Sequence, residues 1–325
     1  MEYTTLGKTG TNVSRLCLGC DAFGSSDPWK LDPDDAHEII DRAIELGINF
    51  FDTANVYSSG ESEQILGDAI EEYDRDELVI GTKVGETMDE TDPNGSGLSR
   101  KAIETEIAGS LDRLGIDTVD LYQIHRWDYQ TPIEETLRTM SDLVRRGRVR
   151  YLGASSMWAY QFGDIIHACD RLGMDPFVSM QNHYTLPYRE EEREMIPLCE
   201  NEGVGLIPWS PLGRGYLTRP DTDETTTNRE RTDEYIDEHV STYRQAGGKA
   251  INERVEELAS DYGVSMAQIA LAWHLHKEPV DAPILGTTSV RHLEDAVEAI
   301  DIDLTSSEIS YLEEPYRPVN VFRHE

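Results

Sequence analysis

The chain has 325 residues, 38% of them hydrophobic, which is enough to bury one large core. Asp and Glu total 63 against 29 Lys and Arg, and the formal net charge of −34 repels nucleic acid and anionic membrane surfaces. No apolar stretch reaches membrane-spanning length and the first ten residues show no signal-peptide pattern, so we expect a cytoplasmic protein with no nucleic-acid or membrane partner.

The acidic residues are spread along the whole chain rather than gathered in one block. Lysine is scarce, and the six lysines are Lys8, Lys30, Lys83, Lys101, Lys249 and Lys277. One interpretation is an acidic interaction tail, although a tail would concentrate the acids. The interpretation that we favour is a halophilic protein, whose solvated acidic surface suits high salt because salt screens self-repulsion.

Cys17 and Cys20 form a C-x-x-C pattern, which occurs in redox and metal sites. They lie inside an apolar run, and no second C-x-x-C or Cys/His cluster follows. We therefore interpret both as small core residues and predict no metal site.

Eight short apolar runs have the length and composition of β-strands, and each is bounded by glycine or by charge. They cover residues 15–20, 48–53, 77–83, 119–125, 149–156, 177–182, 204–210 and 282–288.

Amphipathic helical patterns lie between these runs, and several have clear start signals. Asp32 is a candidate N-cap, and Ser99 begins a second pattern that ends at Gly115. Thr131 is a candidate N-cap with Glu134 three residues on, which predicts a capping box.

This alternation of strands and helices predicts a single α/β domain, residues 1–325, built as a (β/α)8 TIM barrel. An open doubly wound sheet is the alternative, but it would usually show G-x-G-x-x-G after its first strand. Residues 3–16 predict an N-terminal β-hairpin that could plug the bottom of the barrel. Residues 213–246 predict a long functional or disordered loop, one of the extended loops of the C-terminal part.

Titratable side chains follow three neighbouring strands directly: Asp52, Lys83 and His125. Tyr57 lies five residues beyond Asp52 in a loop rich in serine and glycine. Because the C-terminal ends of parallel strands meet at one face of a barrel, we expect these four side chains to lie together.

The four side chains suit proton donation to a developing alkoxide. An ammonium beside Tyr57 favours the phenolate and lowers the pKa of the phenol, and a buried Lys83 needs the counter-charge of Asp52. His125 can hydrogen-bond the substrate oxygen or help to relay a proton. The set contains no carbon nucleophile, so a hydride must come from a cofactor.

Seven motifs in this order carry a resemblance to a known family: "FDTANVYSSGESE", "TKV", "DLYQIHRWD", "GASS", "QNHYTL", "IPWSPLGRG" and "LGTTSVRHLEDA". The chain is similar along essentially its whole length to the aldo-keto reductase superfamily, and most of all to its bacterial and fungal aryl-alcohol-dehydrogenase-like branch. The resemblance implies that Asp52, Tyr57, Lys83 and His125 are the catalytic tetrad. It also implies NAD(P)H-dependent reduction of aldehydes and ketones.

The resemblance further implies how a nicotinamide cofactor is held. Ser155 and Gln181 would bind the carboxamide, and Trp209 would stack on the nicotinamide ring. Ser156 departs from the family, which often has Asn there.

The remaining cofactor contacts implied by the resemblance follow later in the chain. The pyrophosphate would lie against Ser210, Leu212 and Arg214, and the adenosine end against Gly286, Thr287, Thr288 and Asp295.

Cofactor preference depends on the charge near Thr288. Members that prefer NADP usually have Lys or Arg at the position of Thr288 or Ser289, whereas both are hydroxyl residues here. Arg291 is the nearest cation in the sequence, and arginine binds phosphate bidentately. We therefore expect NADP(H), with NAD(H) as the alternative.

Aromatic residues in three expected pocket loops predict a pocket for a small-molecule carbonyl substrate: Trp29, Trp127 and Tyr129. Two other functions fit parts of the same pattern. One is a nicotinamide-binding regulatory subunit with little turnover. The other is a phosphate-binding lyase or isomerase that uses Lys83 as a Schiff base.

The net charge predicts a dependence on salt. The Debye length is about 30 Å at 0.01 M salt and about 3 Å at 1 M, so acids repel one another across a whole face in dilute buffer. The melting temperature and kcat/KM for the polyanion NADPH should both rise from about 0.1 M to about 2 M KCl. A flat melting temperature with the highest activity in dilute buffer would contradict the halophilic interpretation.

Overall fold

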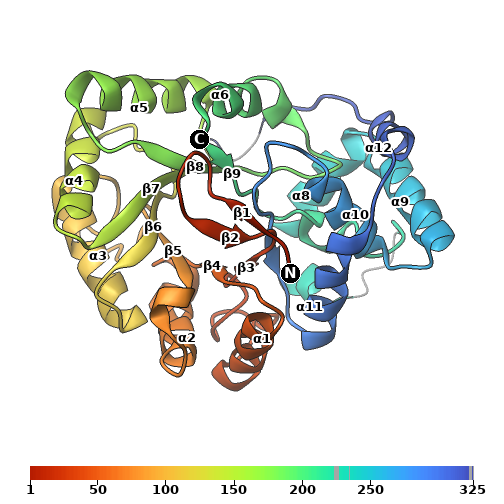
Figure 1. The fold of residues 1–325 in the computed structure, drawn as a ribbon, viewed down its shortest axis with the longest axis horizontal. Helices are drawn as coiled ribbons and strands as arrows, with labels where there is room; N and C mark the ends of the chain where they lie inside the picture. The colour runs from red at the N-terminus through yellow and green to blue at the C-terminus, as the bar shows by residue number, and fades with distance from the viewer. Residues whose placement is uncertain (223–226, 234, 322–323, 325) are drawn as a thin grey trace.

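Eight parallel strands form the central sheet of the computed structural model, which describes residues 1–222, 227–233, 235–321 and 324 (Figure 1). The strands are β3 Cys17–Gly19, β4 Phe50–Asp52, β5 Val79–Val84, β6 Val119–Ile124, β7 Val149–Ser155, β8 Phe177–Gln181, β9 Gly205–Leu206 and β10 Ile284–Gly286. Seven lie within the predicted runs and β5 extends one residue beyond its run, to Val84, so the strand predictions are confirmed.

Helices surround this sheet (Figure 1). They are α1 Pro33–Glu45, α2 Glu61–Ile70, α3 Arg100–Leu114, α4 Ile133–Arg145, α5 Ala159–Leu172, α6 Met195–Glu202, α7 Asn228–Thr232, α8 Ile236–Gln245, α9 Gly248–Tyr262, α10 Met266–Leu275, α11 Val290–Val297 and α12 Ser306–Glu313. No helix in these described ranges is both long enough and apolar enough to cross a membrane.

The sheet closes on itself. Its strands run in the order β10, β3, β4, β5, β6, β7, β8 and β9, each parallel to its neighbour. Parallel bridges join Trp209 to Ile284 and Leu206 to Val280 beyond the last strands, and Ile284 N donates to Pro208 O at 2.9 Å. The predicted (β/α)8 barrel is confirmed, and the open sheet is not observed.

Two of the three predicted helix starts are observed. Asp32 caps α1 by accepting from Asp35 N at 3.1 Å, and Ser99 caps α3. The capping box at Thr131 is wrong, because α4 begins after Pro132. The Thr131 hydroxyl instead donates to Asp128 Oδ2 at 2.7 Å, so it is engaged in the preceding turn.

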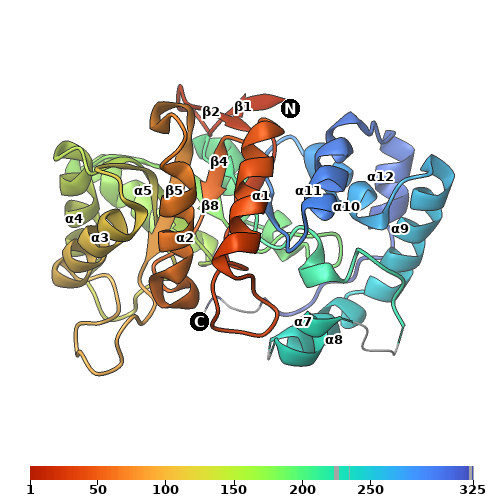
Figure 2. The same cartoon turned by 90° about the horizontal axis from the view of Figure 1, so that it is seen from below.

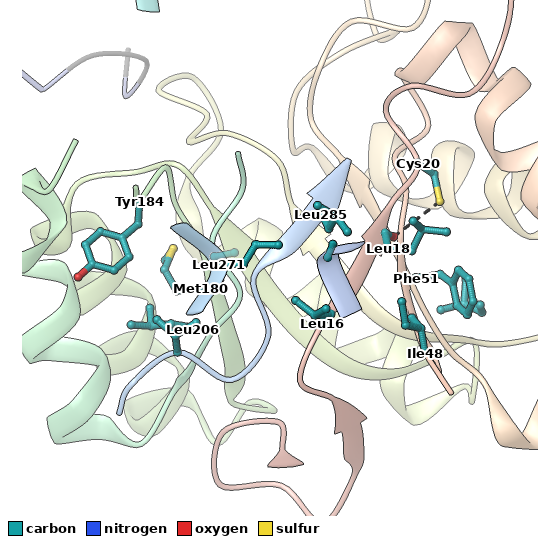
Figure 3. Packing of buried hydrophobic residues seen from close by; sticks show 14 of the residues in the cluster. Leu16, Leu18, Cys20, Ile48, Phe51, Met180, Tyr184, Leu206, Leu271 and Leu285 are labelled. Carbon is teal, nitrogen blue, oxygen red and sulfur yellow. Dashed lines mark hydrogen bonds between the residues drawn. The ribbon is translucent and has the colours of Figure 1, made fainter. Parts of the chain in front are cut away.

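The two faces of each strand explain how a carboxylate follows an apolar run. Successive side chains on a strand point to opposite faces. Phe51 packs outward in the core between sheet and helices, a region that Figure 3 shows at close range. Phe50 belongs instead to the apolar cluster inside the barrel, and Asp52, two residues on, is on the same side as Phe50.

The predicted hairpin forms the floor of the barrel. Its strands are β1 Tyr3–Thr5 and β2 Asn12–Ser14, and they lie at the end opposite to α7 and α8 (Figure 2). Leu6 and Val13 are fully buried in the same interior cluster as Phe50 and Leu121. The hairpin therefore closes the N-terminal ends of the strands with apolar side chains.

Long segments cover the other end. Residues 213–246 contain α7 and α8, although 223–226 and 234 lie outside the described residues. Beyond α12 the chain returns across this end, where Arg317 N donates to Ala246 O and Val319 N to Glu190 Oε1, both at 2.9 Å. These segments border the mouth of the barrel.

Candidate active site

The barrel interior changes from apolar to polar along the strands. Above the cluster of Phe50 and Leu121 lie Asp52 on β4 and Lys83 on β5, and His125 follows β6 directly. Asp52, Lys83 and His125 are all buried. Their positions result from strand alternation and register, since each strand contributes a polar side chain at its C-terminal end.

Lys83 links Asp52 to Tyr57. Its Nζ donates to Asp52 Oδ2 at 2.5 Å, to Thr53 O at 3.0 Å and to Tyr57 OH at 3.0 Å. The Lys83 side chain is 0% exposed, so this ammonium exchanges its hydration for three protein oxygens. The contact between Asp52, Lys83 and Tyr57 that the sequence predicts is present.

Two glutamines satisfy the second oxygen of Asp52. Gln123 Nε2 and Gln181 Nε2 donate to Asp52 Oδ1 at 2.8 and 2.9 Å. A Cβ on Gly153 would lie 2.9 Å from Gln123 Cγ, so glycine at this position leaves room for the glutamine. Sequence analysis missed Gln123, although it precedes His125 by two residues and therefore lies on the same, interior side of β6 as the residue that directly follows the strand.

Tyr57 stands on a strained turn. Ser58 and Ser59 follow it with φ of +48° and +54°, in the left-handed region that non-glycine residues rarely adopt. Ser156, Ser210 and Arg214 also have positive φ, and each of these three lines the cavity described below or adjoins a residue that does. Such strain clusters at functional sites.

Burial and charge act in opposite directions on Tyr57. Burial disfavours the phenolate, and this effect outweighs the nearby Lys83 ammonium, so the pKa of Tyr57 is raised to about 12. Sequence analysis predicted a lowered pKa; Lys83 does act in that direction but does not determine the net shift. Burial also disfavours the Lys83 ammonium, but Asp52 and Tyr57 overcome it and raise the pKa of Lys83.

His125 is held neutral. Burial, together with the charges of Lys83 and Arg126, lowers the pKa of His125 well below its ordinary value. Its ring meets the Tyr57 ring edge to face, with centroids 5.8 Å apart. In the described part of the chain its buried Nδ1 has no hydrogen-bond partner. His125 therefore offers hydrogen-bonding capacity beside Tyr57 without adding charge.

A cavity of about 790 Å³, called the tetrad cavity below, opens above these residues and extends beyond them along the mouth of the barrel. Asp52, Tyr57 and His125 line it, and so do most of the predicted cofactor contacts: Ser155, Gln181, Trp209, Ser210, Leu212, Arg214, Gly286, Thr287, Thr288 and Asp295. Trp29, a predicted substrate contact, lines it as well.

Two contacts hold the side chain of Trp209, a ring stack and a hydrogen bond. The His183 ring stacks on it with centroids 4.2 Å apart and planes 21° from parallel. The indole Nε1 donates to Ser156 Oγ at 3.0 Å. These contacts fix the plane of an aromatic ring whose residue lines the cavity.

The cavity reverses the charge balance of the chain. Its described lining has five cationic residues, Lys30, Arg126, Arg214, Arg219 and Arg229, against three acids, Asp21, Asp52 and Asp295. The whole chain has less than one cation for every two acids. An anionic ligand is therefore favoured locally.

Three predicted site residues lie elsewhere. Trp127 and Tyr129 line a neighbouring pocket of about 750 Å³, which shares Arg126 with the tetrad cavity. Arg291 is not among the lining residues of the cavity; its side chain is 85% exposed and lies 4.0 Å from Asp295. Among the described residues, no group of three His, Cys, Asp or Glu side chains gathers in a geometry able to hold a metal ion.

Comparison with known proteins shows the family of this chain. Residues 15–317 match the Aldo/keto reductase family. The chain is 43% identical to a putative aryl-alcohol dehydrogenase of Schizosaccharomyces pombe, over 98% of this chain and 97% of that protein. It is 42% identical to versiconal hemiacetal acetate reductase of Aspergillus parasiticus and 38% identical to a putative aryl-alcohol dehydrogenase of Saccharomyces cerevisiae, over 98% of each chain.

The architecture is that of a parallel α/β barrel whose C-terminal strand ends carry the polar residues. The chain belongs to the aldo/keto reductase family, as its sequence motifs predict, and is an oxidoreductase.

Substitutions in the ion pair between Lys83 and Asp52 test its contribution to stability separately from its contribution to turnover. Lys83→Met leaves the Asp52 carboxylate buried without a counter-charge, so it should lower the free energy of unfolding by about 3–5 kcal/mol. Asp52→Asn combined with Lys83→Met buries no charge and should recover most of this loss, but not aldehyde reduction. Denaturant unfolding and turnover would be measured on both variants. Full turnover by the double variant would contradict this division.

Proposed function

We propose that this protein reduces aldehydes and ketones to alcohols with NADPH, and that Tyr57 is the general acid. The observation that carries the proposal is the hydrogen-bonded series Asp52, Lys83, Tyr57 at the base of a cavity lined by cations.

Tyr57 would donate its proton to the carbonyl oxygen as that oxygen gains charge. Because burial keeps the phenol protonated at neutral pH, the proton is available when the substrate binds. Lys83, 3.0 Å from the phenol oxygen, then stabilises the phenolate until solvent returns a proton. Neutral His125 would hold the carbonyl oxygen by a hydrogen bond. A nicotinamide cofactor held in the cavity would supply the hydride for the carbonyl carbon.

The residues along the cavity fit a nicotinamide dinucleotide. Gln181 donates to Asp52, and Ser155 pairs with Gln181 across β7 and β8, so both would face an amide group bound at this end of the cavity. Farther along, Arg214 suits a pyrophosphate. Arg214 and Arg229 both bind Asp233 Oδ2, at 2.8 and 3.1 Å, so the guanidinium groups are preorganised.

Two alternatives are less well supported. A Schiff-base enzyme needs a neutral lysine, whereas Asp52 and Tyr57 raise the pKa of Lys83 and keep it as the ammonium. A nicotinamide-binding regulatory subunit would use the same cavity but would not need the series from Asp52 to Tyr57. Both the Schizosaccharomyces and Aspergillus relatives have names that describe a redox enzyme, which favours turnover. Absence of aldehyde-dependent NADPH oxidation in the purified protein would favour the regulatory role.

Tyr57→Phe tests the proton donor. The phenyl ring keeps the shape of the site but has no proton to give, so kcat should fall by about 10²–10⁴-fold or more. NADPH binding, measured by fluorescence titration, should persist. Near-normal turnover of this variant would rule out Tyr57 as the acid.

Arg291→Ala tests the preference for NADPH. If Arg291 binds the 2′-phosphate, the variant should bind NADPH about tenfold more weakly, the lower end for a charged hydrogen bond because the side chain is exposed. NADH binding should change little. Arg145→Ala, which removes an exposed arginine from α4, is the matched control. Equal losses for NADPH and NADH would show that Arg291 does not recognise the phosphate.

A further inference from the structure

Lys30 is a nearly buried cation in the tetrad cavity that the proposed chemistry does not use. It lies on the loop between β3 and α1, and its side chain is 8% exposed. Its Nζ donates to Ser58 Oγ at 3.2 Å. In the described part of the chain its ion-pair partner is Asp27, at 3.6 Å, whose side chain is 44% exposed.

These contacts compensate the charge of Lys30 incompletely. Lys83, the other lysine of the cavity region, has a buried carboxylate at 2.5 Å. Lys30 has a neutral hydroxyl, the face of the Trp29 ring at 5.6 Å from its centroid, and a longer contact to a carboxylate that solvent screens. An ammonium removed from water is stabilised when an anion joins it at hydrogen-bond distance. The lining of the cavity therefore contains a cation with capacity for one more anionic partner.

The loop that carries Lys30 is held firmly. Ser25 N donates to Glu61 Oε2 and Leu31 N to Ala22 O, both at 2.8 Å. A Cβ on Gly24 would lie 2.5 Å from the Ser58 side chain, so glycine allows the loop to lie directly on Ser58. The position of Lys30 is thus set by the fold before any ligand arrives, which limits the entropy lost on binding.

The location of Lys30 relates it to the reacting group. Its hydrogen-bond partner Ser58 directly follows Tyr57, and Lys30, Tyr57 and His125 line the same cavity. Arg214 and Arg229 are joined through Asp233 on the later segment, and Arg229 also lies over the ring of Trp29, 4.1 Å from its centroid. Because the partner Ser58 directly follows Tyr57, we infer that an anionic group at Lys30 belongs to a molecule that also reaches Tyr57.

We propose that Lys30 binds a carboxylate of the carbonyl substrate, so that the enzyme selects oxo acids over neutral aldehydes and ketones of the same shape. This inference rests on the proposed reductase function. The acidic surface repels such substrates at long range, and the cations of the cavity reverse that preference locally.

The experiment compares substrates that carry a carboxylate with their methyl esters, which remove the charge and add one methyl group. The probes are 4-carboxybenzaldehyde and 4-oxobutanoate, each set against its methyl ester, at saturating NADPH and one fixed salt concentration. The intact protein should show a higher kcat/KM for each acid than for its ester. In Lys30→Met the ratio of acid to ester should fall by about 10–100-fold, the range for a charged hydrogen bond.

Further variants separate recognition from structure. Lys30→Arg keeps the charge and should keep a preference for the acid, and Asp27→Asn removes the competing carboxylate and should increase it. Lys101→Met, which replaces an exposed lysine of α3, should leave the ratio unchanged. Equal losses for acid and ester in Lys30→Met would make Lys30 a structural contact with Ser58 and overturn the proposal.

Cofactor binding is the second source of an anion at this site, and its phosphates are tested separately. If the Kd of NADPH rises in Lys30→Met while the ratio of acid to ester stays constant, Lys30 serves the cofactor and the proposal is wrong. Reduction of the esters without any preference for the acids in the intact protein overturns the proposal but leaves the reductase function. Failure to reduce any of the four probes with NADPH overturns both.

Discussion

The buried ion pair between Lys83 and Asp52 is the interaction on which the rest of the site depends. Two charges in a barrel interior are costly unless their remaining hydrogen-bonding capacity is satisfied. Gln123 and Gln181 donate hydrogen bonds to the carboxylate. Thr53 O and Tyr57 OH accept hydrogen bonds from the ammonium. A buried pair of this kind is weak evidence of stability. What the pair does provide is a fixed positive charge beside the phenol of Tyr57.

The fold supplies the dry environment that this arrangement needs. The hairpin of β1 and β2 closes the lower end of the barrel with Leu6 and Val13, so water does not reach the ion pair from below. Above it, burial raises the pKa of Tyr57 while Lys83 opposes that rise. The balance leaves Tyr57 protonated in the resting protein and gives its conjugate base a stabilising partner, which are the two properties that a reversible proton donor requires.

The sequence predicts the parts of this structure that follow from periodicity. Asp52, Lys83 and His125 are predictable because each ends an apolar run and parallel strand ends meet at one face of a barrel. Contacts that depend on loop paths are not predictable in this way. Arg126 and Trp127 are adjacent in the chain, yet Arg126 reaches the tetrad cavity and Trp127 lines only the neighbouring pocket. Threonine is a common helix N-cap, but the hydroxyl of Thr131 donates a hydrogen bond to Asp128 instead of capping α4.

The contrast between surface and cavity follows from how salt acts on charge. Exposed charges farther apart than a Debye length scarcely interact, whereas buried pairs are screened much less. In concentrated salt, an acidic surface therefore neither repels an anionic ligand strongly nor attracts one, and recognition depends on contacts inside the cavity. A largely buried carboxylate orients two of its cations, since Asp233 binds both Arg214 and Arg229. Lys30 differs because its carboxylate partner Asp27 is half exposed, so the charge of Lys30 is the more available to a ligand. A large negative net charge and a cationic cavity are thus compatible in one chain, because they act over different distances.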